Sequence, residues 1–372
     1  MYLYFARIRN FYARKKAGNI DFLKNKIYYT IKKKEVIAMG KQRNITLDIL
    51  KLIAAYFVVF IHIPFYGEFG NIISALARFA VPIFFMTSGY YCYGQTTSDI
   101  KKKIFKIVKI LLFASILYNL CDVFRVCVLN GFSEIPLFLQ SRFNFTRLYE
   151  LLVFNIPFSA TRLWFLLALI YVYVIQSFFV KFKVDHKVIF IFSIVFIALN
   201  LILGEGLQIF GIIIPEHYFR NFILTAYPFF VFGLFYRKYY EYIIKVKHII
   251  PWSVFVLGVV ITLLSPAAMN RVALHCGAVL ITISLFALAI SQTTRKYPNW
   301  LIDLSKCCLG IYFFHRPVAD AFYLISKLLG LPTKGLIFLN SYPLIVCVLS
   351  TLVSIIFNKV LNICKRQKCN KI

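Results

Sequence analysis

The chain has few acidic residues and few charged residues overall. Only 14 of its 372 residues are Asp or Glu, and charged residues make up 15%, whereas soluble domains contain about 25%. Hydrophobic residues reach 60%, so too little polar surface exists to cover an ordinary soluble globule. The same hydrophobic content excludes a disordered chain.

Several motif classes are missing as well. The nine cysteines are scattered without a CxxC pair, so we expect no metal site and no disulfide framework. Neither a zinc-finger spacing nor a basic helix followed by heptads occurs, so the net charge of +29 does not indicate a nucleic-acid partner. The short alternating segments of an outer-membrane barrel are also lacking.

Long apolar runs dominate the chain instead. A membrane-spanning helix needs about 20 mostly apolar residues, and ten runs approach that length. The sequence therefore predicts an all-α, polytopic transmembrane helical bundle of about ten spans, surrounded by the lipid bilayer. The predicted spans cover residues 46–66, 72–93, 104–129, 162–180, 187–204, 219–236, 249–265, 271–291, 307–329 and 342–363.

The connections between these runs alternate in charge. Four connections are rich in lysine and arginine, and the intervening ones are poor in both. By the positive-inside rule, the basic connections and both termini lie in the cytoplasm. The long connection 130–161 is predicted to hold a short interfacial helix. The basic connections lie at residues 101–103, 181–187, 237–247 and 295–306.

The two terminal segments are predicted to be basic and cytoplasmic. Residues 1–43 precede the membrane domain, which spans 44–363, and residues 364–372 form the tail. A signal peptide is not predicted, because no uninterrupted apolar core follows the N-terminal charges. Residues 1–38 have two interpretations. They either contact anionic lipid or precede an alternative natural start at Met39.

The first predicted span carries three polar residues on one face. Lys51 and His62 are eleven residues apart, so at 100° per residue their directions differ by only about 20°. At 1.5 Å per residue they are about 16 Å apart along the axis. Asp48 precedes Lys51 by three residues, a spacing that allows an ion pair.

These residues have structural explanations as well as functional ones. Ionisable groups within a membrane usually face the bundle interior or a water-filled cavity. Lys51 and Asp48 could equally be interfacial anchors, and His62 could be a hydrogen-bonded packing residue. In a polar cavity, however, an imidazole can act as a general base, because it titrates near neutral pH.

Other polar and aromatic positions lie near the outer boundary or inside the second span. Arg78 lies at a depth comparable to that of His62, where it could hold an anionic group or a polarised carbonyl, or it could snorkel to the interface. Trp164 opens the fourth span, where it could belong to an interfacial aromatic belt or stack on a sugar. Ser88 and Gly89 permit close helix packing, and Pro82 predicts a kink.

Four segments carry a resemblance to a known family. They are LDILKLIAAYFVVFIH (47–62), ARFAVPIFFMTSGYY (77–91), RLWFLLALIYVY (162–173) and CCLGIYFFHRPV (307–318). The chain resembles the acyltransferase-3 family of integral membrane acyltransferases, ten-span bacterial proteins of which many O-acylate surface polysaccharides. The family's first span has arginine, ten residues and histidine. Here Lys51 replaces that arginine, which keeps the charge but loses the planar fork.

The resemblance implies a membrane O-acetyltransferase in the bacterial cytoplasmic (inner) membrane. It would move an acetyl group from acetyl-CoA to a hydroxyl of a cell-envelope or capsular polysaccharide or its lipid-linked precursor. Lys51 would bind the coenzyme, and His62 would deprotonate the acceptor or transiently carry the acyl group. Substrate or oxyanion contacts would come from Arg78 and Trp164, and the supporting residues would be Asp48, Ser88 and His315.

Two other functions explain some of the same features. A transporter or flippase of polysaccharide precursors also places charges in a midplane cavity. Such proteins often have internal repeats, and residues 44–205 show no clear similarity to residues 206–363. A membrane scaffold would tolerate apolar residues at Lys51, His62 and Arg78.

Overall fold

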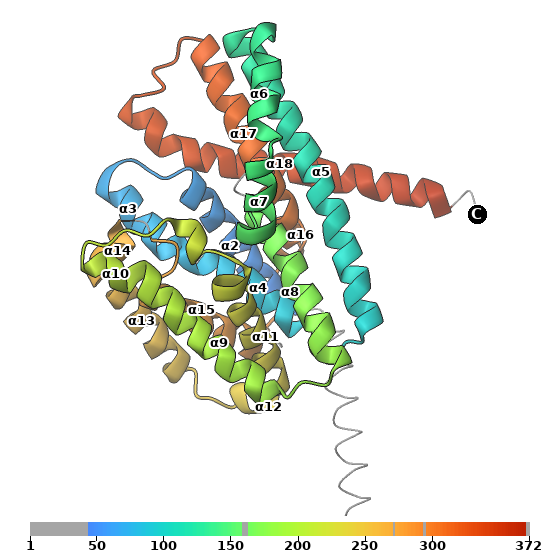
Figure 1. Cartoon of the computed structure of the whole chain (residues 1–372), viewed down its shortest axis with the longest axis vertical. Helices are drawn as coiled ribbons and strands as arrows, with labels where there is room; N and C mark the ends of the chain where they lie inside the picture. The colour runs from blue at the N-terminus through green and yellow to red at the C-terminus, as the bar shows by residue number, and fades with distance from the viewer. Residues whose placement is uncertain (1–43, 158–162, 271, 293–294, 370–372) are drawn as a thin grey trace, which may run out of the picture.

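The structure is a computed structural model that describes residues 44–157, 163–270, 272–292 and 295–369. The predicted N-terminal segment 1–43 lies outside the described residues. Helices joined by turns and loops make up the described part of the chain, which contains no strand. Its helices form a bundle from which the C-terminal half of α18 (Leu336–Cys369) projects (Figure 1).

Helix α2 (Ile45–His62) lies at the centre of the bundle. Asn44 caps its first turn, because the Asn44 side chain accepts a hydrogen bond from the Leu47 amide at 3.0 Å. The helix contains no glycine or proline, so it runs without a kink from Lys51 to His62. Its neighbours are α4 (Ala80–Tyr90), α15 (Cys276–Ser291), α16 (Asn299–Ser305), α17 (Cys308–Leu328) and α18.

The second predicted span is a helix with an irregular turn in its middle. It consists of α3 (Gly67–Leu76), a 3₁₀ turn (Ala77–Phe79) and α4. Pro82 lies one turn further along and cannot donate to the carbonyl of residue 78, which loosens the backbone where the 3₁₀ turn occurs. Arg78 therefore projects from the irregular turn rather than from a regular helix.

Helix α4 crosses α11 (Tyr227–Lys238) at very short distance, because glycines occupy the crossing. A Cβ atom on Gly89 would lie 1.8 Å from the Phe230 carbonyl oxygen, and one on Gly233 would lie 1.9 Å from the Met86 carbonyl oxygen. Neither position has room for any side chain. The close packing predicted at Gly89 is thus confirmed, and it uses backbone contact between two membrane helices.

The other helices surround this centre. A capping box between Thr96 and Asp99 begins α5. The connection predicted to hold one short helix holds two, α6 and α7. The bounds are α5 (Thr97–Asn130), α6 (Ile135–Arg142), α7 (Phe145–Phe154), α8 (Trp164–Lys181), α9 (His186–Leu201), α10 (Leu207–Ile209), α12 (Tyr240–Ile243), α13 (Ile249–Leu264) and α14 (Pro266–Met269).

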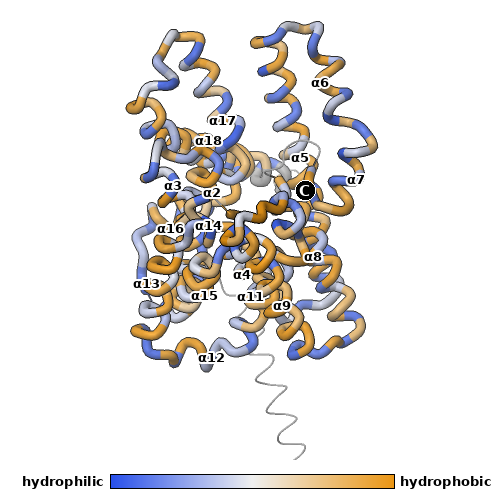
Figure 2. Tube along the Cα trace, turned by 60° about the vertical axis from the view of Figure 1, so that its left-hand side comes forward, coloured by the Kyte–Doolittle hydropathy of each residue, from blue (hydrophilic) through white to orange (hydrophobic). Residues whose placement is uncertain are grey.

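The chain is a multi-pass membrane protein by helix length and hydropathy. Six helices in the described part are long and apolar enough to span a bilayer, and two shorter apolar helices accompany them. The six are Ile45–His62, Gly67–Tyr90, Thr97–Asn130, Trp164–Lys181, His186–Ile209 and Leu336–Cys364. Hydrophobic residues cover most of the helical trace (Figure 2).

Two of the ten predicted spans belong neither to the six long apolar helices nor to the two shorter ones. The run 219–236 is divided into a π-helical turn (Phe222–Ala226) and the short α11. The run 307–329 forms the single helix α17, but Arg316, Asp320 and Lys327 lower its hydropathy. In both cases the helical segment predicted from the sequence is present.

Candidate functional site

A cavity of about 520 Å³ opens beside the first turns of α2. Helices α2, α4, α5, α8 and α17 form its walls. Four lysines and a single aspartate are its charged lining residues, so the lining carries net positive charge, although Lys306 pairs with Asp303 at 2.6 Å. The polar and charged lining residues are Asp48, Lys51, Thr87, Ser88, Tyr91, Lys103, Lys106, Tyr173, Ser305, Lys306, Cys308 and Tyr312.

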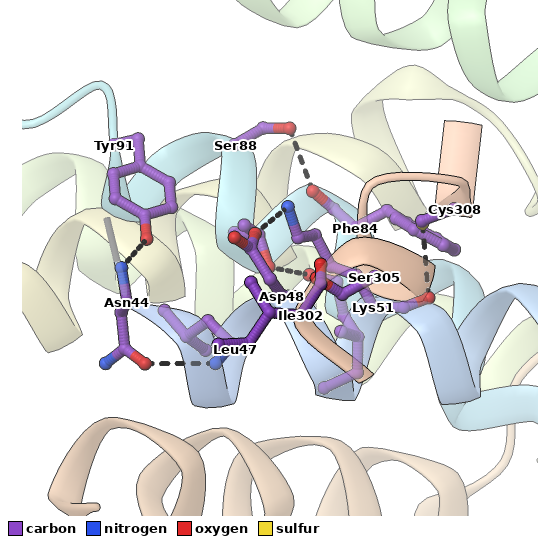
Figure 3. Close-up of polar contacts among 12 residues, drawn as sticks. Asn44, Leu47, Asp48, Lys51, Phe84, Ser88, Tyr91, Ile302, Ser305 and Cys308 are labelled. Carbon is purple, nitrogen blue, oxygen red and sulfur yellow. Dashed lines mark hydrogen bonds and ion pairs between the residues drawn. The ribbon is translucent and has the colours of Figure 1, made fainter. Parts of the chain in front are cut away.

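Lys51 and Asp48 form an ion pair in this cavity, as their spacing predicted. The Lys51 Nζ lies 2.6 Å from Asp48 Oδ1 (Figure 3). The Asp48 side chain is 9% exposed and that of Lys51 is 25% exposed. The carboxylate is therefore buried with a charged partner, which offsets the cost of its desolvation, while the ammonium remains accessible from the cavity.

A second lysine is bound to the wall across from α2. Lys103 Nζ donates a hydrogen bond to the Tyr91 carbonyl at 2.9 Å and lies 5.6 Å from the centre of the Tyr173 ring. The Tyr91 hydroxyl in turn accepts a hydrogen bond from the Asn44 amide at 3.2 Å (Figure 3).

Ser88 lies on the same wall. Its Oγ donates to the Phe84 carbonyl at 2.8 Å (Figure 3), one turn earlier in α4. On the opposite side, the Cys308 thiol donates to the Lys51 carbonyl at 3.3 Å and ties the start of α17 to α2. These contacts fix the backbone on both sides of the Lys51–Asp48 pair.

At the other end of α2, two histidines face each other. The rings of His62 and His315 stack with their centroids 5.4 Å apart and their planes inclined by 10°. His315 is 1% exposed, and its Nδ1 lies 2.8 Å from the Tyr312 carbonyl oxygen. Since a carbonyl can only accept, Nδ1 carries the hydrogen, and Nε2 is the acceptor of the neutral ring.

Tyr312 connects the cavity with the histidine pair. Its side chain lines the cavity and packs edge-on against Phe165, with ring centroids 5.7 Å apart. Its carbonyl holds His315. The cations and the imidazoles are thus two ends of one region, separated by three turns of an unbroken helix.

A known family matches most of the chain. The model of the acyltransferase 3 family, described as an acyltransferase domain, matches residues 44–359. The chain belongs to the acyltransferase 3 family. The resemblance seen in the sequence is therefore confirmed, and membership implies acyltransferase activity and an acyl donor. No curated protein and no solved structure matches the chain.

Two residues that the acyltransferase resemblance marked for substrate or oxyanion contacts lie outside the lysine cavity. Arg78 is half-buried in the turn before α4 and interacts electrostatically with His275, which caps α15. Trp164 is buried inside the bundle. It is 7% exposed, lies 6.0 Å from the Phe85 ring and is covered by the Arg220 guanidinium at 5.4 Å.

Sequence reasoning missed two components of the candidate site. Residues 101–103 were interpreted as a cytoplasmic connection, but they belong to the first turns of α5, and Lys103 turns into the cavity. The contact between His62 and His315 joins residues 253 positions apart, so no local pattern could predict it. A lysine adjoining an apolar run was the signal available for Lys103.

Proposed function

We propose that this family member is a membrane O-acetyltransferase that uses acetyl-CoA and acylates a hydroxyl of a cell-envelope glycan or its lipid-linked precursor. A single observation carries the proposal. One straight helix has a lysine-lined cavity at one end and a stacked histidine pair at the other, about 16 Å away along the axis.

The cavity suits the charged part of the donor. Its volume of about 520 Å³ lies in the range of small-molecule sites, about 300–1,000 Å³. Coenzyme A carries phosphate groups, and lysines bind phosphate as compact point charges. In our proposal Lys51 binds these phosphates while Asp48 holds its ammonium in position, and Ser88 helps to shape the wall.

The histidine pair suits the chemical step. His62 accepts the proton of the acceptor hydroxyl while the oxygen forms a bond to the thioester carbonyl carbon. The carbon–sulfur bond breaks, and the coenzyme leaves as a thiolate that takes the proton from the His62 imidazolium. The products are the acetyl ester and free coenzyme A. His315, held by the Tyr312 carbonyl, keeps the His62 ring oriented through the stack.

Arg78 and Trp164 would serve the acceptor side. A fixed guanidinium can stabilise the oxyanion that develops on the carbonyl oxygen. Trp164 is buried and its ring is covered by the Arg220 guanidinium, so it would support the acceptor side by packing rather than by stacking on a sugar. We further propose ten spans with both termini in the cytoplasm and a bacterial cytoplasmic membrane as the location. The basic connections support that orientation.

The proposal is tested by acetyl transfer from labelled acetyl-CoA. The purified chain in vesicles receives the donor on the side of the basic connections and a lipid-linked glycan on the other. We expect base-labile label in the glycan and an equal amount of free coenzyme A. Absence of label in every glycan of the source cell envelope, from protein that binds coenzyme A, would show that the proposed function is wrong.

A further inference from the structure

A second cavity lies beside the first, at the end of the bundle where the basic connections gather. Its volume is about 640 Å³. The connection between α4 and α5 and the connection between α8 and α9 form much of its wall. Its lining residues include Gln95, Gln176, Phe179, Lys183, Ile189 and Leu234.

Two buried amide oxygens belong to the lining of this cavity. Gln176 projects from the apolar helix α8 and is 2% exposed. Among the described residues, neither its Oε1 nor the Oε1 of Gln95 has a hydrogen-bond partner. A buried acceptor without a partner costs free energy, so a ligand that donates two hydrogens to these oxygens would relieve that cost.

The rest of the wall determines what kind of donor fits. Phe179, Ile189 and Leu234 present apolar surface in the same lining, which also contains Lys183, Asp185 and His186. The apolar surface favours a flat ring over a ligand covered with hydroxyls. Adenine has flat apolar faces and an exocyclic amino group whose two hydrogens amide oxygens can accept.

One carbonyl connects the two cavities. The Tyr91 oxygen accepts a hydrogen bond from Lys103 Nζ at 2.9 Å and another from Gln95 Nε2 at 2.7 Å. The Lys103 ammonium in the first cavity and the Gln95 amide in the second therefore share one acceptor, and two hydrogen bonds separate them. A ligand with phosphates beside Lys103 would have its nucleoside end next to Gln95.

We infer that the second cavity binds the adenine ring of a nucleotide, and that this nucleotide is the adenosine end of the acyl-CoA donor. The assignment to the donor rests on the proposed function. The adenine contact itself does not require acyl transfer. In this arrangement the two amide oxygens accept hydrogens from the adenine amino group, the phosphates lie near Lys103, and the acyl arm extends along the first cavity.

The test measures binding to the full chain in nanodiscs by calorimetry, with coenzyme A, AMP and 4′-phosphopantetheine as probes. We expect Gln176→Leu to lower the affinity for coenzyme A about tenfold. The affinity for 4′-phosphopantetheine, which has no adenine, should change by less than about twofold. Loss of affinity for both probes, or for neither, would overturn the inference. The matched control is Gln140→Leu, on the exposed surface of α6.

Two further measurements complete the test. AMP that displaces coenzyme A supports the adenosine subsite, whereas AMP that binds without displacing it assigns the cavity to a separate nucleotide and overturns the inference. Gln176→Leu removes an amide oxygen that has no hydrogen-bond partner among the described residues, so we expect that the thermal unfolding midpoint does not fall. Should that variant not fold, Gln95→Leu gives the same comparison. Binding is measured without turnover, so failure here is distinct from failure of acetyl transfer.

Discussion

The two ends of α2 have different surroundings although they share one helix face. At the Lys51 end the neighbours are charged and the cavity is open to solutes. At the His62 end the neighbours are aromatic, and a backbone carbonyl fixes the orientation of the second imidazole. The first end can bind through charge, which tolerates small displacements, whereas the second depends on the position of individual ring atoms.

This contrast explains how the chain can carry lysine where the family signature has arginine. Lys51 is one of four lysines that line the cavity. Lysine in place of arginine there would change the strength of anion binding without moving any reacting atom. A change at His62 has no comparable compensation, because His315 is turned toward the Tyr312 carbonyl through Nδ1. We therefore expect substitutions at the two ends to affect different kinetic constants.

The largest effect is expected for His62→Ala. Loss of a general base lowers kcat by about 10²–10⁴-fold, while coenzyme A binding stays unchanged because Lys51 is about 16 Å away along the axis. Labelled acetyl transfer and calorimetry measure the two quantities. The matched control is His248→Ala, at an exposed position before α13. If His62→Ala transferred acetyl groups at the full rate, the assignment of the chemical step to the His62 end of α2 would be wrong.

A smaller effect is expected for Lys51→Met, and it should appear in KM. Loss of one charged contact raises KM for acetyl-CoA about tenfold with little change in kcat. Because the substitution leaves Asp48 buried without its ion-pair partner, the double variant with Asp48→Asn separates binding from folding. Lys51→Arg should retain donor affinity, and Lys327→Met, at an exposed position late in α17, is the control. A fall in kcat alone would contradict this assignment.

The smallest effect is expected from salt. Raising the ionic strength from about 0.1 M to about 1 M shortens the screening length from about 10 Å to about 3 Å. KM for acetyl-CoA should rise a few-fold, since the cavity cations are partly exposed, and kcat should remain constant. Initial rates at both salt concentrations measure this. Equal salt dependence of both constants would mean that charge also governs the histidine end.

The helical segments could be predicted well because they are encoded locally. The prediction 249–265 corresponds to α13 within one residue, whereas α5 ends within one residue of the prediction 104–129 but begins seven residues before it. Apolar length and flanking charge decide such bounds. The π-helical turns at Ile202–Gly206 and Phe222–Ala226 could not be foreseen, since they depend on packing against neighbouring helices.

The candidate site could be predicted only where its members are neighbours in the chain. The Lys51–Asp48 pair follows from helical spacing alone. Trp164 was interpreted from its place at the end of a run, and only tertiary packing shows that it is buried. Gln176 did have a local signal, because an amide inside an apolar span is costly, but the cavity beside it comes from distant segments.

The unbroken course of α2 has a consequence for how such a chain can change over time. Eleven residues make almost exactly three turns, so His62 keeps the direction of Lys51 only while that count is preserved. One inserted or deleted residue would turn the ring by about 100° and move it by about 1.5 Å. The helix therefore allows the cation to be exchanged for another of the same sign, whereas keeping both side chains on one face requires an unchanged number of residues between them.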